Sequence, residues 1–535
     1  MNILRKPDTL YLQLEGEPVS PVEGGGIEIV EQEDRLDVFL ESDQPVCRIG
    51  LRWANPLPAG ARILGGAWQR AYGDLEWRGV VPDRILPKCL TLHANGKTMA
   101  VGLAAPSAAF GFWQVDETDI WLWLDVRNGG EGIHLNGRRL HVTSLFQVDS
   151  QTDESAFSTL RSLYKKICPE PRLPGTPVYG GNDWYHAYGN NTAEGILHEA
   201  AMIKSWSADA KGSPFMVIDA GWQATTTTNG PLGGGPWTES NDRFPDLPGL
   251  AAKIKALGVR PGIWIRPLAA PENTSKELLL PESRASSTND RYTRTLTYDP
   301  SIPEVLETIE EEVRALRDWG FDLLKHDFSS IDILGKWGQS FERGLAASGW
   351  HFADRTRTTA EIIREFYCAL RRGMGDEIII GCDTFLHLGA GLFEVQRIGE
   401  DSSDINWRQT RLHSINGLAF RMPQHETMHA IDPDCIGITK DSPWELNRRW
   451  MDLISKSGAP LFISADPDAI NAAQEVAIRK AFAVASRPKP YAEPLDWMET
   501  TCPRHWRTAE GVETFDWADH SGQSVFKGFF ATQEI

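Results

Sequence analysis

The sequence predicts a multidomain protein with an N-terminal antiparallel β-sandwich, a central (β/α)8 TIM barrel and a short C-terminal β segment. Short runs of alternating apolar and polar residues recur before about residue 170. Strand-like and helix-like segments then alternate as far as about residue 470, which is typical of a parallel barrel or a doubly wound sheet. Polar residues follow strand after strand, at the face where such barrels carry their active sites. The 535 residues allow two or three domains, which we place at 1–170, 171–487 and 488–535.

The N-terminal region has strand-like runs at residues 9–14, 26–30, 35–40, 120–126 and 140–146, separated by clusters of Gly, Pro, Asn and Asp. Short strands at this spacing favour an antiparallel sandwich. Residues 155–168 have helical periodicity and are followed by Pro169, Pro171 and Pro174. We therefore place the first domain boundary after this helix.

The barrel region alternates predicted strands and helices. The strands are expected at 178–184, 214–219, 260–267, 321–325, 377–383 and 459–466, and the helices at 193–205, 250–257, 301–319, 358–373, 406–418 and 444–456. Ser301 followed by Glu304 predicts a capping box at the start of one helix. The C-terminal tail suggests short strands at 513–517 and 524–530.

Composition narrows the class of partner. A net charge of −19 argues against a nucleic acid or an anionic membrane surface as partner and leaves a neutral or cationic ligand unopposed. Seven scattered Cys without CxxC spacing argue against a disulfide framework or a zinc site. His425, Glu426 and His429 stand in the order His-Glu-x-x-His; we nevertheless expect neither a metal nor a cofactor. An oligomer is compatible with the sequence.

The N-terminus turns charged at once and has no apolar h-region. No apolar run approaches the length of a membrane span. A cytoplasmic protein is therefore expected, although a trimmed export signal would leave no trace.

The segment Trp319–Ser330 carries the first functional signal. Lys325 and Asp327 stand two apart at the end of a buried strand, so both side chains face the same way. A buried cation and carboxylate are costly unless they pair or do chemistry. A structural ion pair is the alternative to a catalytic role. His326 alternates with both and is expected to point outward into the helix layer.

Seven motifs in order resemble glycoside hydrolase clan D, the α-galactosidase families 27 and 36. They are Gly180-Gly-Asn-Asp-Trp-Tyr, Val217-Ile-Asp-Ala-Gly-Trp, Tyr298-Asp-Pro-Ser-Ile-Pro-Glu-Val, Leu324-Lys-His-Asp, Arg397-Ile-Gly-Glu-Asp, Asp432-Pro-Asp-Cys and Ser457-Gly-Ala-Pro-Leu-Phe-Ile-Ser-Ala-Asp. The resemblance covers about residues 176–470. The β-rich N-terminal region is more like family 36, whereas the Arg397 loop and the Asp432 segment are more like family 27.

This resemblance implies a retaining mechanism with two carboxyl groups about 5–5.5 Å apart. Asp327 matches the nucleophile, and Lys325 beside it is expected to keep it ionised. Asp401 matches the acid/base, with Asp404 as the rival assignment. Crowding of carboxylates in residues 399–404 is expected to raise the pKa of at least one of them. Arg397 would hold a sugar hydroxyl, or pair with one of these acids.

Other matches imply contacts with the sugar. Asp219 matches the first of two paired aspartates that grip sugar hydroxyls, and Asp383 ends the strand that recognises the sugar 2-position. Cys382 before it is expected to be a small buried residue. Trp184 and Trp264 are candidate stacking walls, although core packing is as good an explanation for each.

The second of the paired aspartates is replaced by Ala220. An α-galactosidase is the first expectation for function. The replacement keeps a β-L-arabinopyranosidase open, because that sugar lacks the exocyclic CH2OH group. A raffinose-synthase-like transglycosidase also stays open, as does a barrel that binds sugar without cleaving it.

Overall fold

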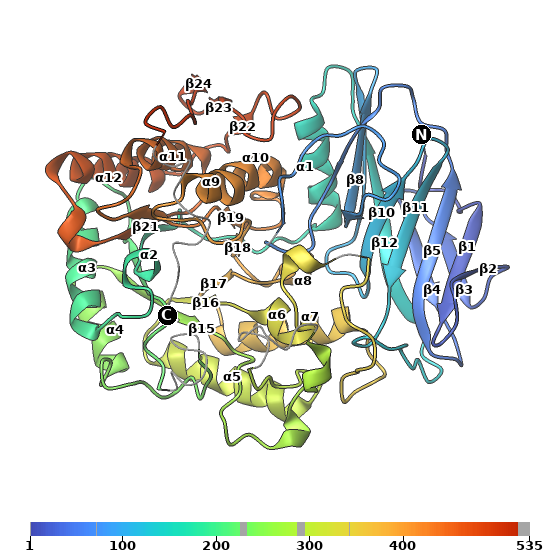
Figure 1. Cartoon of the computed structure of the whole chain (residues 1–535), viewed down its shortest axis with the longest axis horizontal. Helices are drawn as coiled ribbons and strands as arrows, with labels where there is room; N and C mark the ends of the chain where they lie inside the picture. The colour runs from blue at the N-terminus through green and yellow to red at the C-terminus, as the bar shows by residue number, and fades with distance from the viewer. Residues whose placement is uncertain (1, 71, 225–232, 286–294, 342, 523–535) are drawn as a thin grey trace.

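The computed structural model describes residues 2–70, 72–224, 233–285, 295–341 and 343–522. Antiparallel strands from residues 9–149 lie at one end of the molecule, beside a larger body of parallel strands and helices (Figure 1). The strand predicted at residues 524–530 lies outside the described residues.

The N-terminal region contains two antiparallel sheets of six strands each. The first has the order β2-β1-β5-β11-β10-β7 and the second β3-β4-β12-β9-β8-β6. Their bounds are β1 Thr9–Leu14, β2 Ser20–Val22, β3 Ile27–Glu31, β4 Arg35–Leu40, β5 Val46–Ala54, β6 Arg62–Gly65, β7 Leu86–Pro87, β8 Cys89–Ala94, β9 Lys97–Leu103, β10 Phe110–Val115, β11 Asp119–Asp125 and β12 Leu140–Asp149.

Both sheets turn an apolar face toward one core. Val38 of β4 belongs to the same buried cluster as Leu51 and Trp53 of β5, although the two strands lie in different sheets. Alternate residues of a strand point to opposite faces, so each sheet contributes its inward set to this cluster. The predicted β-rich region is confirmed as two antiparallel sheets.

The larger body is built on a nine-stranded parallel sheet with the order β19-β18-β17-β16-β15-β14-β13-β21-β20. Its strands are β13 Tyr179–Asn182, β14 Phe215–Ile218, β15 Arg260–Ile265, β16 Leu323–His326, β17 Ile378–Gly381, β18 Val395–Arg397, β19 Ala430–Asp432, β20 Ile436–Ile438 and β21 Leu461–Ala465. Only residues 433–435 separate β19 from β20, the two edge strands. Such a short link requires the edges to lie near each other, so the sheet is curled.

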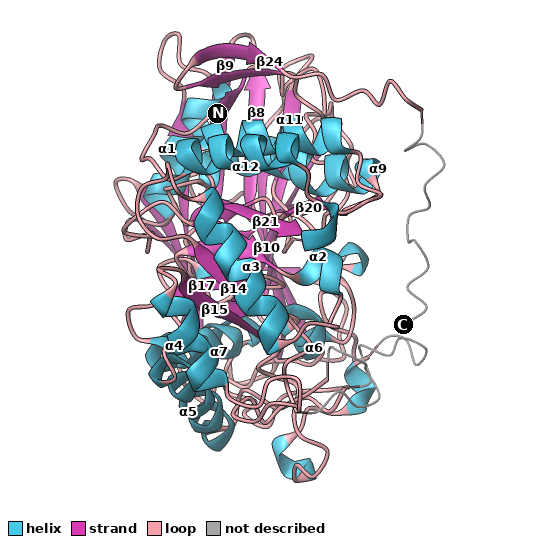
Figure 2. Cartoon of the chain, turned by 90° about the vertical axis from the view of Figure 1, so that its left-hand side faces the viewer, coloured by secondary structure: helices cyan, strands magenta, loops and turns pink. Residues whose placement is uncertain are grey.

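Helices cover the outside of this curled sheet (Figure 2). α1 Ala156–Ile167 packs instead on β9 and β12 of the N-terminal region. The other α-helices are α2 Trp184–Ala187, α3 Ala193–Trp206, α4 Leu247–Ala256, α5 Pro303–Asp318, α6 Ser329–Leu334, α7 Thr359–Met374, α8 Leu386–Gly389, α9 Trp407–Thr410, α10 Gly417–Arg421, α11 Trp444–Ser457 and α12 Ala472–Ala485. The helices predicted at 155–168, 193–205, 358–373 and 444–456 are confirmed within one or two residues at each end.

Two local predictions differ from the structure. The capping box at Ser301 is wrong, because α5 begins at Pro303 with Ile302 as its N-cap. The Ser301 hydroxyl instead accepts the backbone N–H of Asp354 at 3.1 Å. The single helix predicted at 406–418 is interrupted: α9 and α10 flank a π-helical segment, Arg411–Asn416.

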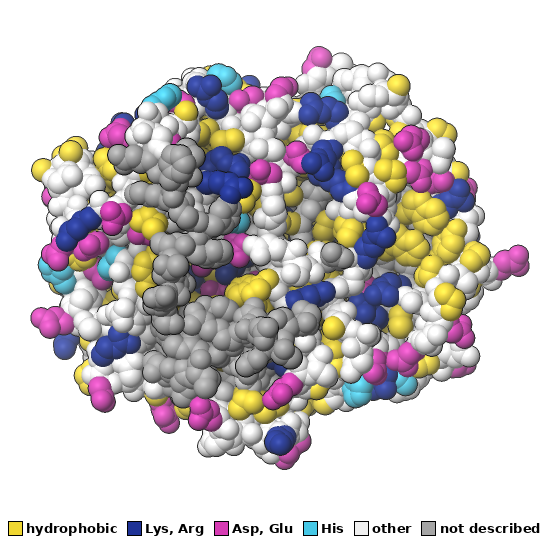
Figure 3. Space-filling view, in the orientation of Figure 1, with side chains coloured by type: hydrophobic (Ala, Val, Ile, Leu, Met, Phe, Trp, Pro, Cys, Tyr) yellow, Lys and Arg dark blue, Asp and Glu magenta, His cyan; other side chains and the backbone are white. Residues whose placement is uncertain are grey.

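The chain continues into a three-stranded antiparallel sheet of β22 Glu493–Pro494, β23 His505–Thr508 and β24 Gly511–Thr514. Trp407 of α9 donates its indole N–H to the carbonyl of Trp517, which ties this segment to the helix layer. None of the described helices is both long and apolar enough to cross a membrane. Acidic and basic side chains are interspersed on the face that Figure 3 shows.

Candidate active site

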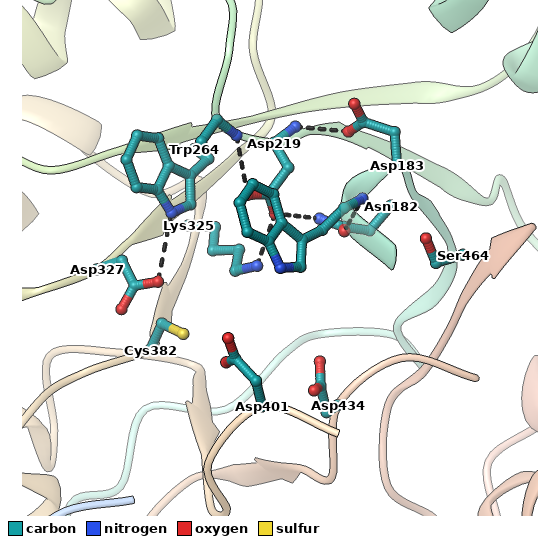
Figure 4. A network of polar contacts seen from close by, with 12 residues as sticks. Asn182, Asp183, Asp219, Trp264, Lys325, Asp327, Cys382, Asp401, Asp434 and Ser464 are labelled. Atoms are coloured by element: carbon teal, nitrogen blue, oxygen red, sulfur yellow. Dashed lines mark hydrogen bonds and ion pairs between the residues drawn. The ribbon is translucent and has the colours of Figure 1, made fainter. Parts of the chain in front are cut away.

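Polar side chains gather at the carboxyl ends of neighbouring parallel strands. Asp219 follows β14, Asp327 follows β16, Asp383 lies two residues after β17, and Arg397 ends β18. Because the strands are parallel, these ends meet at one edge of the sheet. Figure 4 shows Asp219, Lys325, Asp327 and Asp401 arranged around a common central space.

Lys325 of β16 forms an ion pair with Asp219, which follows β14, so the pair spans the intervening strand β15. Its Nζ lies 2.6 Å from Oδ2 of Asp219, and both side chains are buried. The Asn182 side-chain amide donates to the same oxygen at 2.7 Å, and the backbone N–H of Ala220 donates to Oδ1 at 2.8 Å. Three donors and little exposed surface leave Asp219 at most one more hydrogen bond to accept.

Asp327 is held by backbone and indole N–H groups. Its Oδ1 accepts the N–H groups of Phe328 at 2.8 Å and Asp383 at 3.1 Å, and its Oδ2 accepts the indole N–H of Trp264 at 3.4 Å. Phe328 has φ of +61°, in the left-handed region. The chain therefore turns sharply just after the carboxylate, before α6 begins.

Arg70 brings a cation from the N-terminal region to both proposed catalytic carboxylates. It lies in the loop between β6 and β7, and its side chain is buried. Its Nη1 donates a hydrogen bond to Oδ1 of Asp401, and its Nη2 lies 3.7 Å from Oδ1 of Asp327. One planar guanidinium group thus contacts Asp327 and Asp401, which requires the two carboxylates to lie near each other.

Burial and charge act in opposite directions on these carboxylates. Burial raises the pKa of Asp327, but the charges of Arg70 and Lys325 outweigh it, and the pKa lies below its ordinary value. The expected effect of Lys325 on Asp327 is confirmed, although the direct partner of Lys325 is Asp219. Burial likewise raises the pKa of Asp401, but Arg70 and Arg397 hold it well below the usual range.

The crowded acidic loop does contain a carboxyl with a raised pKa, but it is Glu400. Burial raises the pKa of Glu400 to about 7, and the neighbouring charge of Asp401 adds to the effect. The prediction that one member of the loop is raised is therefore confirmed. The pKa of Asp401 itself is lowered, because the guanidinium groups of Arg70 and Arg397 both contact its carboxylate.

Asp404, the rival acid/base, lies in a different environment. It is buried, and it accepts the hydroxyl groups of Tyr188 at 2.7 Å and Thr439 at 3.1 Å. The side chain of Asp401 is 44% exposed and shares Arg70 with Asp327. Of the two, Asp401 is the carboxylate that the structure brings together with Asp327.

Arg397 forms ion pairs with two acids. Its Nη2 lies 3.1 Å from Oδ1 of Asp401 and also contacts Oδ2 of Asp434. Asp434 accepts further hydrogen bonds from the Tyr185 hydroxyl and from the N–H of Ser402, at 2.7 Å for the latter. The anticipated salt bridge of Arg397 is thus present.

The two candidate stacking residues, Trp264 and Trp184, differ in how deeply they are buried. Trp264 is 1% exposed and packs edge-on against Trp237 and Phe328. Trp184 is half-buried on α2 and packs against Tyr188.

Asp383 and Cys382 lie side by side in the chain and differ in their partners. Oδ1 of Asp383 accepts the Ser330 hydroxyl at 2.7 Å, and burial raises its pKa to about 6. Cys382 is buried, as expected, with its Sγ 3.6 Å from Nη1 of Arg397.

His326 points away from the site. Its ring packs against Phe366 and Tyr367 of α7 and against Phe393. Burial lowers its pKa to about 3, so the ring stays neutral. The predicted outward orientation is confirmed.

Arg70, Asp434 and Tyr185 take part in this network although no sequence pattern assigned them a role. Asp434 and Tyr185 fall inside motifs that resemble clan D, so the motifs marked their neighbourhood. Arg70 falls in no motif. Within the described residues, no group of three or more His, Cys, Asp or Glu side chains is arranged to hold a metal ion.

Comparisons by sequence find no match: no model of a known protein family and no curated protein is similar enough. Comparison with solved structures does find matches. An α-galactosidase from Thermus thermophilus, solved with p-nitrophenyl α-D-galactopyranoside, is similar with a TM-score of 0.62 and 18% identity over 95% of this chain and 99% of that chain.

A family 36 α-galactosidase from Geobacillus stearothermophilus, solved with 1-deoxygalactonojirimycin, has a TM-score of 0.62 and 14% identity over 94% of this chain and 77% of that one. The galactosidase domain of an α-galactosidase–sucrose kinase has a TM-score of 0.58 and 14% identity over 90% and 73%. The chain therefore has the fold of the α-galactosidases, and the structural relationship to clan D that the motifs predict is confirmed at the level of the fold.

Proposed function

We propose that the chain is a retaining, exo-acting glycoside hydrolase of the α-galactosidase type, with Asp327 as nucleophile and Asp401 as acid/base. The observation that carries the proposal is the contact of both carboxylates with the single guanidinium of Arg70. A shared guanidinium keeps the two carboxyl groups near each other, as a retaining mechanism requires.

The reaction would proceed by double displacement. An oxygen of Asp327 attacks the anomeric carbon while the bond to the leaving oxygen breaks and Asp401 gives that oxygen a proton. Asp401, now a carboxylate, then takes a proton from water, which attacks the anomeric carbon and releases Asp327. Lys325 and the N–H groups of Phe328 and Asp383 favour the ionised nucleophile.

For the acid step, Asp401 must carry a proton, so its pKa must rise when substrate binds. Without substrate, Arg70 and Arg397 keep this carboxyl ionised. A glycoside that enters between Asp327 and Asp401 must displace Arg70 from the carboxylate. Losing one of two contacting cations raises the pKa of Asp401, so sugar binding itself prepares the acid for protonation.

The sugar is proposed from the structural neighbours and from Ala220. Solved neighbours carry p-nitrophenyl α-D-galactopyranoside or stachyose, which favours an α-galactoside for this chain. Ala220 is fully buried where the paired motif has a second aspartate. A β-L-arabinopyranoside is the second candidate, because it lacks the CH2OH group that the missing acceptor would serve.

We further propose that the curled sheet closes as a (β/α)8 barrel in which β19 and β20 are two halves of the seventh strand. The chain order of the strands around the sheet supports this, since β13 to β18 are consecutive neighbours and β21 joins β13 to β20. The site would then lie at the mouth of the barrel. The two antiparallel N-terminal sheets would form the predicted sandwich.

Chemical rescue of nucleophile and acid/base variants tests the proposal. Beforehand, a panel of p-nitrophenyl glycosides (α-galactoside, β-L-arabinopyranoside, α-N-acetylgalactosaminide and α-glucoside) identifies the substrate. Asp327→Ala should then lose turnover, and sodium azide should restore it by forming a glycosyl azide of inverted configuration. Asp401→Ala with azide should give the azide of retained configuration, because the first displacement still uses Asp327.

Asp322→Ala is the matched control, because Asp322 lies at the opposite end of the same strand and pairs with Lys255 at 2.7 Å. It should retain activity. Near-normal activity of Asp327→Ala would remove Asp327 from its role. Transfer to an added acceptor sugar would favour the transglycosidase, and sugar binding without any hydrolysis would favour the binding barrel.

A further inference from the structure

The turn that follows the proposed nucleophile has a strained backbone conformation. Phe328 comes directly after Asp327 and has φ of +61° and ψ of 4°, in the left-handed region that a residue with a bulky side chain rarely adopts. Such a conformation persists only where its surroundings hold it. The turn directs the backbone N–H of Phe328 toward Oδ1 of Asp327, 2.8 Å away. Contacts that hold Phe328 in this conformation therefore also orient the carboxylate of Asp327.

A buried arginine lies against the ring of Phe328. Arg266 follows β15 and is fully buried. The central carbon of its guanidinium lies over the Phe328 ring, 4.4 Å from the ring centroid. A cation over an aromatic face is attracted to the ring, and more strongly where water is excluded. Phe328 is itself 7% exposed, so the contact is shielded from solvent.

Asp332 fixes this guanidinium from within α6. Nη2 of Arg266 donates to Oδ1 of Asp332 at 2.5 Å, and Nε donates to Oδ2 at 3.0 Å. Both side chains are at most 1% exposed. Two hydrogen bonds to one carboxylate set the plane of the guanidinium as well as its distance. The face that Arg266 presents to Phe328 is therefore held in one orientation.

Backbone contacts close the same turn. The N–H of Asp332 donates to the carbonyl of Phe328 at 2.8 Å, and Nε of Arg284 donates to the carbonyl of Asp332 at 2.8 Å. Asp332 is thus linked to Phe328 twice, once through the backbone and once through Arg266. These contacts connect the turn after Asp327 to the end of β15, the neighbouring strand.

The chemistry of this ion pair fits a role in orientation. Well-packed apolar side chains can often replace a buried ion pair without loss of stability. An apolar pair would not supply a planar cation that is held by two hydrogen bonds and stacks on a ring. The contact between Arg266 and Phe328 depends on that planar group.

We propose that Arg266 is a positioning residue for Asp327, which it orients through Phe328. The inference rests on the proposed role of Asp327 as the nucleophile. Arg266 keeps Phe328 in the left-handed conformation, and the Phe328 N–H then holds Oδ1 of Asp327 in place. Without this guanidinium, Phe328 would relax toward negative φ and its N–H would leave Oδ1.

The double variant Arg266→Met/Asp332→Asn tests the proposal, because it removes both charges and leaves no member of the pair as an uncompensated ion. With a glycoside that the wild type cleaves, kcat should fall about 100-fold, since a misplaced nucleophile slows the chemical step. KM should stay within about twofold, because sugar binding is retained. The control Arg127→Met/Asp125→Asn removes a buried ion pair of the N-terminal region and should leave kcat unchanged. Arg266→Lys keeps a cation for Asp332 but loses the planar group, and it should also lower kcat.

A crystal structure of the double variant separates this inference from the proposed function. Phe328 should leave the left-handed region, and its N–H should no longer lie within hydrogen-bond distance of Oδ1 of Asp327. If the wild type cleaves no glycoside, the proposed function fails, and the crystal structure alone decides whether Arg266 holds the turn. If the double variant fails to fold, Arg266→Lys takes its place in both measurements. A kcat equal to that of the wild type, or an unchanged turn at Phe328, would overturn the proposal.

Discussion

Replacing Arg70 by Met tests how the N-terminal region sets the chemistry of the barrel. The variant removes a buried cation that contacts both Asp327 and Asp401. A carboxylate's pKa falls by about 1–3 units when a cation stands within about 4–6 Å. Asp401 is 44% exposed, and solvent screens part of the effect there. The low end of that range, about 1 unit, is therefore the expected rise in the pKa of Asp401 in Arg70→Met, and the pKa of buried Asp327 should rise by at least as much.

The assay is the pH dependence of kcat/KM with whichever p-nitrophenyl glycoside the wild type hydrolyses. Both limbs of kcat/KM report the free enzyme, in which Arg70 contacts both carboxylates, so the two limbs together report the two carboxyl groups. Because Arg70 lowers both pKa values, its removal should move both limbs to higher pH by about 1 unit or more.

Two control variants accompany Arg70→Met. Arg70→Lys keeps the charge and should shift the limbs less. Arg411→Met removes a surface arginine that pairs with Asp74 and should shift neither limb. Limbs of Arg70→Met that coincide with those of the wild type, in a variant with unchanged Tm, would refute the reasoning.

Two further predictions concern stability. Lys325→Met leaves the buried carboxylate of Asp219 without its cation. Urea titrations should therefore show a free energy of unfolding that is lower by roughly 3–5 kcal/mol. A loss below about 1 kcal/mol would show that the ion pair is not needed for stability. Burial raises the pKa of Glu312 to about 7 from 4.5, so wild-type stability should fall as pH rises through that window, by at most roughly 3 kcal/mol. Glu312→Gln should be more stable than wild type at about pH 8 and not at about pH 4. The control Glu311→Gln, on the exposed face of the same helix, should leave the stability unchanged at both pH values. If the stability of wild type and of Glu312→Gln depended equally on pH, the raised pKa would not belong to Glu312.

Local patterns of the sequence predicted much of the fold because they report which face of an element is buried. The period-2 runs of the first 150 residues and the helical periodicity at 155–168 correspond to strands and to α1. The pattern failed where a tertiary contact competed. Ser301 looked like an N-cap, but its hydroxyl is taken by the N–H of Asp354, 53 residues away.

The candidate site shows the same limit. Spacing alone placed Lys325 and Asp327 on one face of a strand, but the partner of Lys325 is Asp219, which only the order of β14, β15 and β16 brings near. Crowding of acids predicted a raised pKa in residues 399–404. Which carboxyl it belongs to depends on Arg70, 331 residues from Asp401 in a loop without a motif. Long-range pairs of this kind leave no trace in local sequence.

The stereochemistry of hydrolysis tests the central claim most directly. The wild-type chain is mixed with a p-nitrophenyl glycoside that it cleaves, and the anomer formed first is followed by proton NMR before mutarotation. Asp327 and Asp401, both in contact with Arg70, predict that the released sugar first has the configuration of the substrate, which is α for an α-galactoside. Initial release of the opposite anomer would contradict the double displacement and the roles assigned to both carboxylates.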